Sequence, residues 1–463
     1  MHEIYDLVLR QRASDSIMRN FLHLLLTIAL CSCAVGPDFQ PSESPAVNHY
    51  SNERPSDQDA AATAVEQPTP TTSDTIPAQW WQMFESAALD QLVRRGLEHN
   101  PTLAAAKASL EASRETLRAN SGALLSPALD GSLNSTRKKI TGASFGAPNL
   151  GSIYTVHSAS LDISYALDLF GGGRRWLEYG QAQVDYDAFQ LHGARVTLSA
   201  NIVTAAIAEA SLREEITALQ QIIGAEAEQL AVTEQQFNIG VIAKADLLSQ
   251  RAALAQTRTR LPSLQKRLAQ TRHQLATLTG VVPGALADKA ALPQFQLRDL
   301  RLPHTLPLTL PSTLTRQRPD VQAAEALLHQ ASAQVGVATA NLYPQINLSA
   351  NYGSEATRIS DLFSAGSAVW GLGAGLLQPL FHGGELQAKK RAAIARYRQA
   401  AAQYRSSVLT AFREVADALL ALEMDGRNLA LEQRAEQLAA ETMELVRLQH
   451  RQGAVSLLTL LDA

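Results

Sequence analysis

Apolar positions along the chain follow two different periods, and each period recurs in both halves. After Pro101, Leu103, Ala106 and Leu110 share the face of a helix. From 161 to 169 every second residue is large and apolar, which is typical of a strand. The same alternation recurs at 346–353 and 370–376, and a fourth, less regular strand is expected near 129–137. The pattern predicts two strand pairs, four strands per chain.

A long stretch without proline follows each strand pair. The stretches 173–237 and 384–449 are rich in Ala, Leu, Gln, Glu and Arg, and predict helices about 100 Å long. We expect Gly240 and Gly453 to end them in tight turns, and a return helix to run from about 244 to 279. Small residues on several faces favour a wall of packed helices over a two-stranded coiled coil.

The same signals occur in the same order in both halves. Asn100-Pro101 matches Arg318-Pro319, and Gly240 matches Gly453 at a similar offset. Such fixed-offset similarity indicates an internal duplication. We therefore expect a first structural repeat at 80–292 and a second at 293–463.

Each strand pair carries an apolar face that nothing local covers. Exposed hairpins are one interpretation, but lipid would also cover such a face. A sheet in lipid must close into a barrel of about eight strands or more, so four strands per chain require an oligomer. Two copies would give 8 strands and three would give 12. No apolar run reaches the roughly 18 residues of a transmembrane helix.

The amino terminus has the zones of a secretion signal. An apolar stretch at 21–30 follows Arg19, which makes 1–33 a signal region, with Met18 as an alternative start. The sequence Leu-Cys-Ser-Cys at 30–33 resembles a lipobox, and Cys33 is the candidate for a covalent lipid. A plain signal or a reduced thiol pair are the alternatives. Residues 34–79, rich in Pro, Ser, Thr and Ala, are expected to be a lipid-proximal tether.

Composition and charge exclude several classes of function. The 463 residues are 46% apolar and 18% charged with a net charge of −4, which fits a folded protein and argues against a nucleic-acid partner. The 11 His residues form no helical ligand pair, and no triad order is present. The glycines at 371–375 superficially resemble a phosphate loop, but a glycine-rich strand is the better interpretation. We expect no enzyme, metal or cofactor apart from the lipid on Cys33.

The chain resembles the TolC-like outer-membrane efflux factors, in the lipoprotein branch that includes OprM and NodT. The resemblance rests on the order of several motifs: Cys33-Ala34-Val35-Gly36-Pro37-Asp38-Phe39, Trp81, Phe84, Asn100-Pro101, Pro319-Asp320, Phe412-Arg413-Glu414-Val415-Ala416-Asp417 and Gly453 to Ala463. It implies a homotrimer in the cell outer membrane, with a 12-stranded membrane β-barrel and a long α-helical barrel crossing the periplasm. It also implies a periplasmic adaptor protein and an inner-membrane pump as partners. The function implied is passive conduction of small exported molecules.

The resemblance also assigns positions at the periplasmic tip. An apolar ring and an acidic ring of the constriction fall on Leu458 and Asp462. Asp246 matches an acid that in some members links neighbouring helices; its usual partners there are Tyr or Arg, but His450 and Val455 occupy the matching positions in this sequence. Three symmetry-related carboxylates would favour cations.

Two other interpretations remain open. A periplasmic coiled-coil adaptor or scaffold lipoprotein would need heptads and β-rich flanks, and a membrane-bound hydrolase would need a nucleophile and a base. The second repeat stops at Ala463, the counterpart of Gln250, so we expect its return helix to be missing. A truncated, non-functional fragment of such a channel is thus a further alternative.

Overall fold

The computed structural model describes residues 34–40, 69–72, 77–141, 146, 151–284, 292–303, 305–308, 317–456 and 459–460. Helices dominate them: α2 (Ala87–His99), α3 (Pro101–Leu125), α4 (Gly172–Asn238), α5 (Lys244–Leu278), α7 (Pro319–Ala340) and α8 (Glu385–Arg451), with short 3-10 turns η2 (Trp80–Phe84), η5 (Leu297–Asp299) and η6 (Ile359–Asp361). The predicted long helices are present as α4 and α8, of 67 residues each. In this part of the chain, no helix has the length and hydropathy that a membrane crossing needs.

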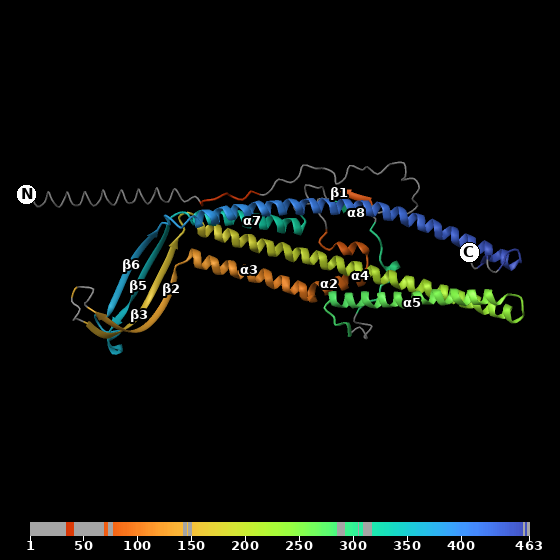
Figure 1. Cartoon of the computed structure of the whole chain (residues 1–463), viewed down its shortest axis with the longest axis horizontal. Coiled ribbons are helices and arrows are strands. Elements are labelled where there is room, and N and C mark those ends of the chain that lie inside the picture. Colours follow the sequence, from red (N-terminus) through yellow and green to blue (C-terminus); the bar gives the residue numbers. More distant parts are fainter. Residues whose placement is uncertain are drawn as a thin grey trace, which may run out of the picture. The chain divides into compact units, whose positions relative to one another are not determined.

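The four predicted strands form one sheet. They are β2 (Ala128–Thr141), β3 (Gly151–Leu167), β5 (Gln345–Ala356) and β6 (Ala368–Leu377), in the order β2-β3-β5-β6 (Figure 1). Every neighbouring pair is antiparallel. The central β3–β5 pair joins the two halves of the sequence, and β2 and β6 are the outer strands.

Two further strands correct the sequence analysis. β1 (Thr69–Thr72) lies in the segment expected to be a lipid-proximal tether, where no strand was predicted, and it pairs in parallel with β4 (Thr305–Leu308). Each strand has four residues, and its partner is distant in the sequence. Local composition cannot reveal such a pairing, because polar residues in a tether and in a strand edge look alike.

The chain divides into two compact units, and each unit draws on both halves of the sequence. The first includes the described residues within 1–42, 109–188 and 323–405, and therefore the whole β2-β3-β5-β6 sheet. The second includes those within 43–108, 189–322 and 406–463. Val335 and Ala338 of α7 pack on Ala393 of α8 in the core of the first unit. Leu89, Ile202, Leu275 and Phe295 are among the fully buried side chains of the second.

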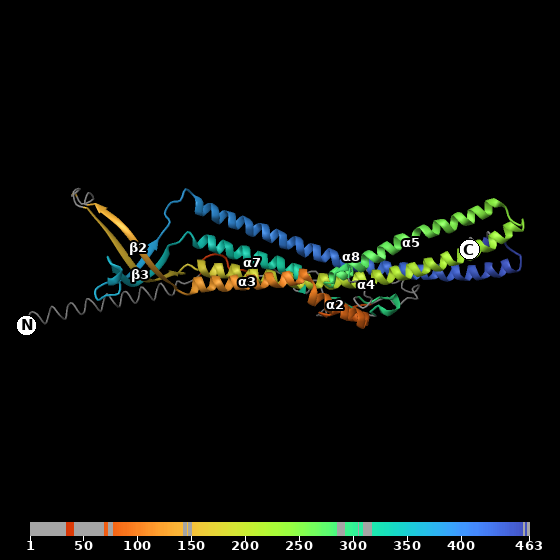
Figure 2. The same cartoon turned by 90° about the horizontal axis from the view of Figure 1, so that it is seen from below.

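Within the second unit, α5 returns antiparallel along α4 (Figure 2). Arg251 pairs with Glu234 at 2.8 Å near the α4–α5 turn, and Thr257 donates to Glu226 at 2.9 Å further along. Glu209 is completely buried, and Arg213 and Arg272 both pair with its Oε1 atom, at 2.7 and 2.8 Å. The backbone N–H of Phe295 donates to its other oxygen at 3.1 Å. This group joins α4, α5 and the segment around Phe295 through the buried Glu209 carboxylate. Removing one of its partners would leave this buried charge less well compensated.

A second charged group fixes the start of α7. Arg318 pairs with Asp320 at 2.7 Å and with Glu414 of α8 at 2.6 Å. Partial burial opposes ionisation of Asp320, but the hydrogen bonds and the charge of Arg318 outweigh it and lower the pKa of the carboxyl. Asp320 also lies in the first turn of α7, where a negative charge is favoured.

Candidate functional site

Strand register gives the β2-β3-β5-β6 sheet one apolar face. Directly paired residues lie on the same face of a pleated sheet. One row joins Leu161 to Tyr352 and Tyr352 to Trp370, and the last two are 64% and 72% exposed. The exposed large apolar residues of this face are Leu129, Leu133, Ile153, Leu161, Ile163, Leu348, Tyr352, Trp370, Leu372 and Leu376. A face this apolar requires cover by a hydrophobic medium or by another protein.

The opposite face of the sheet is predominantly polar, and Ile140 and Leu377 are its exposed large apolar residues. Asp162 pairs with Asp130 on one side and with Asn351 on the other. Asn351 in turn pairs with Gly371, where an added Cβ would lie 2.6 Å from the Asn351 side-chain oxygen. The glycines of β6 therefore leave room for polar side chains from β5. The interpretation of 371–375 as a glycine-rich strand is confirmed, because these residues lie within β6.

The segment 34–40 lies in a seat formed by other residues of the first unit. The Val35 N–H donates to the Phe170 carbonyl at 3.0 Å. Gly36 has a φ of +107°, and a Cβ there would lie 2.6 Å from the Gly336 Cα atom. Only glycine tolerates both this backbone conformation and this close approach to α7.

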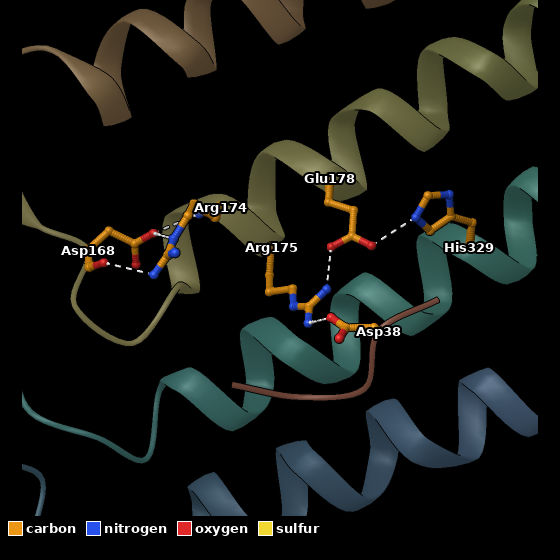
Figure 3. A network of polar contacts seen from close by, with 6 residues as sticks. All are labelled: Asp38, Asp168, Arg174, Arg175, Glu178 and His329. Atoms are coloured by element: carbon orange, nitrogen blue, oxygen red, sulfur yellow. Dashed lines mark hydrogen bonds and ion pairs between the residues drawn. The ribbon is translucent and has the colours of Figure 1, made fainter. Parts of the chain in front are cut away.

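Polar contacts (Figure 3) and one aromatic stack hold the next residues of the segment. Arg175 pairs with Glu178 at 2.7 Å and with Asp38 at 2.5 Å. Glu178 uses its other oxygen to bind the His329 Nε2 atom at 2.8 Å. The Phe39 ring stacks on His329 with centroids 4.2 Å apart. We call Phe170, Arg175, Glu178, His329 and Gly336 the amino-terminal seat.

Burial makes Arg175 the central charge of the amino-terminal seat. Its side chain is 7% exposed, and its Nε atom is buried without a hydrogen-bond partner among the described residues. Burial opposes the charged form, but hydrogen bonds to Glu178 and Asp38 outweigh it and raise the pKa of Arg175. Glu178 belongs to α4 and Asp38 to the segment 34–40, so one of the two counter-ions of Arg175 is independent of the segment.

Asp168 orders the loop that leads into α4. Its carboxylate accepts the backbone N–H groups of Gly173 at 3.0 Å and Arg174 at 2.8 Å. The first turn of a helix offers its N–H groups no partner within the helix, so Asp168 acts as an amino-terminal cap beside the positive end of the helix. The loop contains Phe170, and its order fixes the carbonyl that receives Val35.

The glycines predicted to end the long helices do so in the same way. Gly240 and Gly453 have φ values of +80° and +75°. At each, the glycine N–H donates to the carbonyl three residues back, and the next N–H donates to the carbonyl five residues back. This is the Schellman arrangement, which satisfies the last carbonyls of the helix. Both turns lie in the second unit.

Asp246 and His450 each have a partner on their own segment. The Asp246 carboxylate accepts the Ala243 N–H at 3.3 Å at the start of α5. The His450 Nδ1 atom lies 3.2 Å from the Val455 carbonyl oxygen. Among the described residues of this single chain, no ion pair joins Asp246 to His450. Cys33, Leu458 and Asp462 lie outside the described residues.

Sequence reasoning missed the amino-terminal seat and the buried Glu209 group. The Arg-Arg pair after the glycines at 171–173 was a usable signal, because a cation at a helix start is unfavourable unless a carboxylate compensates it. His329 and Glu209 carry no such signal, since each sits in an ordinary helical pattern.

Long helices that carry a sheet with one apolar and one polar face define a membrane channel of the outer-membrane type. The chain belongs to the outer membrane efflux protein family, whose sequence pattern matches residues 92–281 and 310–463. It is 30% identical over 403 residues to the "Pyoverdine export outer membrane protein OpmQ" of Pseudomonas putida, covering 85% of this chain and 83% of that protein. It is 26% identical to "Nodulation protein T" of Rhizobium leguminosarum bv. trifolii, covering 94% and 89%.

Solved structures give the same result. The outer-membrane channel OprN has a TM-score of 0.81 and 29% identity, and the match covers 93% of this chain and 92% of that one. The Campylobacter jejuni CmeC channel has a TM-score of 0.82 at 23% identity, which shows the fold alone; it covers 93% and 88%. The chain is thus a TolC-like outer-membrane channel component of a tripartite efflux system. Members of this family transport molecules together with an adaptor and an inner-membrane pump.

Proposed function

We propose that three copies of this chain form one channel, with a 12-stranded barrel that conducts small molecules across the outer membrane. The observation that carries this proposal is the two-faced sheet with β2 and β6 as its outer strands. In lipid, each outer strand would leave unpaired N–H and C=O groups, which a neighbouring copy would satisfy. Three four-stranded sheets give a barrel wide enough for a polar interior, whereas two give the smallest barrels, whose interiors side chains fill.

A covalent lipid on Cys33 would anchor each copy. The amino-terminal seat holds Val35 to Phe39, and so fixes the chain two residues after Cys33. A lipid at that position would have a defined place beside the first unit, which also contains the sheet. Acyl chains contribute about 0.8 kcal/mol per buried CH₂ group.

The gate residues remain part of the proposal. Leu458 would form an apolar ring and Asp462 an acidic ring at the periplasmic tip, next to the turn at Gly453. Asp246 and His450 would link neighbouring helices there, in a manner sensitive to the charge of the histidine. An internal duplication is supported by the matching order of α3, β2, β3, α4 and of α7, β5, β6, α8.

Single-channel conductance in a planar bilayer tests the channel proposal. The purified full chain should behave as a trimer and conduct. Asp130→Asn with Asp162→Asn would remove six carboxylates from the interior, so the reversal potential in a KCl gradient should shift away from cation preference. Asp361→Asn, in the exposed β5–β6 connection, is the matched control and should leave the potential unchanged. A trimer without conductance, including in Asp462→Ala, would overturn the proposal.

A further inference from the structure

We propose that the distal end of the β2–β3 hairpin binds phosphate-bearing head groups of outer-leaflet lipids through Arg137 and Lys139. The inference rests on the proposed function for one point, namely that the sheet spans the outer membrane with its helices on the periplasmic side. Both side chains are exposed, and neither forms an ion pair among the described residues.

Strand register places these two cations on the apolar face. Arg137 pairs with Thr155 and Lys139 pairs with Ile153, in the same alternation that carries Leu129 and Leu133. Lys138, between them, pairs with Tyr154 and lies on the polar face. The basic run is thus divided: two charges face the medium that covers the apolar side, and one faces the opposite side.

The height of the cations along the strands matches a head-group layer. The continuous apolar rows of this face extend from Leu167 to Ala159, about 27 Å along the strand at roughly 3.4 Å per residue. At the usual tilt this is about 20 Å in height, slightly less than the roughly 25 Å apolar band of such barrels, and Ile153 is a single apolar residue beyond these rows. The aromatic pair Tyr352–Trp370 lies near their outer end, where interfacial aromatic residues occur. Arg137 follows Leu133 by about 14 Å along the strand, or about 10 Å in height.

Local composition leaves the two charges without compensation. From 131 to 161 the sequence contains no Asp or Glu, but it contains Arg137, Lys138 and Lys139. The connection at 142–150 has no charged residue of either sign. Long basic side chains just outside an apolar band extend toward the polar layer, and an anionic lipid surface attracts them. Phosphate groups on the lipids fit this arrangement of two cations on one strand, because both donate to oxygen anions.

A binding assay on the purified trimer in detergent tests this inference. The probe is fluorescent diphosphorylated lipid A in mixed micelles, a phosphate-bearing outer-leaflet lipid, with the dephosphorylated lipid and inorganic phosphate as competitors. Arg137→Gln with Lys139→Gln should weaken binding about 30-fold, given two charges at an anionic surface. Lys138→Gln changes the same charge on the opposite face and should stay within about twofold of wild type.

Three results would overturn the inference: wild-type binding by the double variant, an equal loss in Lys138→Gln, or full competition by inorganic phosphate at millimolar concentration. If the double variant fails to fold, the inference is tested on the wild-type protein alone. Its binding of the phosphorylated lipid must weaken with rising salt, and the dephosphorylated lipid must not compete with it. Planar-bilayer conductance of the same variants separates the two proposals. Lost lipid binding with normal conductance leaves the channel intact, and binding without conductance contradicts only the channel.

Discussion

Arg175→Met should release the segment 34–40 from the amino-terminal seat. The substitution keeps much of the apolar stem but removes the hydrogen bonds to Glu178 and Asp38. A hydrogen bond to a charged group contributes about 1.5–3 kcal/mol when it is partly buried, as for Glu178, and an exposed ion pair about 0–1 kcal/mol, as for Asp38. Only the Asp38 contact touches the segment directly, and the Glu178 contact acts through His329 and its stacked Phe39. We therefore expect the segment to lose about 1–2 kcal/mol of binding.

Hydrogen exchange of the Val35 amide measures this release, since its N–H donates to the Phe170 carbonyl. The proteins compared would all carry Cys33→Ser, so that no acyl chain is attached. The amide hydrogens of a peptide covering 34–40 should then exchange about 5- to 30-fold faster in Arg175→Met than in the protein without this substitution. Asp38→Asn should give at most about a fivefold effect. Arg118→Met, which removes an exposed pair on α3, is the control. Unchanged exchange in Arg175→Met, or equal acceleration in the control, would refute the reasoning.

Three further outcomes are expected from the second unit. Glu209→Gln should lower the free energy of unfolding by about 1.5–3 kcal/mol, because it removes the charged acceptor of the partly buried Arg213 and Arg272, whereas the exposed Glu214→Gln should have little effect in the same thermal melt. Gly240→Ala should destabilise by about 1 kcal/mol at its positive φ, while Gly224→Ala, in mid-helix, should stabilise by about 0.5–1 kcal/mol; equal signs would contradict this. The lowered pKa of Asp320 means that its stabilising contribution is present above its usual value of 3.8 and is lost as the pH falls through the lowered value. Asp320→Asn should therefore flatten the acid limb of a stability–pH curve, and an unchanged limb would count against the ion pair.

The regular elements were predictable because each depends on a local pattern. The alternation at 161–169 and 370–376 predicts β3 and β6, and the proline-free stretches predict α4 and α8 within two residues. Glycine at positive φ predicts the helix ends at Gly240 and Gly453, since few other residues adopt that conformation. β3 begins ten residues earlier than its alternation indicates, at Gly151, because pairing with β2 extends it through polar residues.

The contacts of the seat and of the β1–β4 pair could not be predicted, because they join distant parts of the sequence; the Arg-Arg pair at 174–175 indicates a compensating carboxylate but not which one. An arginine is normally expected at the protein surface. Arg175 is buried because the carboxylates of Asp38 and Glu178 compensate the cost of removing its charge from water. Gly36 and Gly336 each look like an isolated glycine, and their significance arises only where the segment 34–40 crosses α7. Such sites emerge when tertiary structure brings charges and small residues together.

The outer strands of the sheet have a consequence for the order of assembly. Among the residues that the structure describes, β2 and β6 each pair with one strand, so a single copy inserted in lipid would expose two rows of backbone donors and acceptors. A single inserted copy would therefore be high in free energy. Membrane insertion would then depend on association with other copies. The yield of inserted protein should then rise more steeply than in proportion to the rate of synthesis. A chain with a damaged outer strand would also reduce the yield of its intact neighbours, so a β2 or β6 lesion would be dominant in a cell that carries both versions.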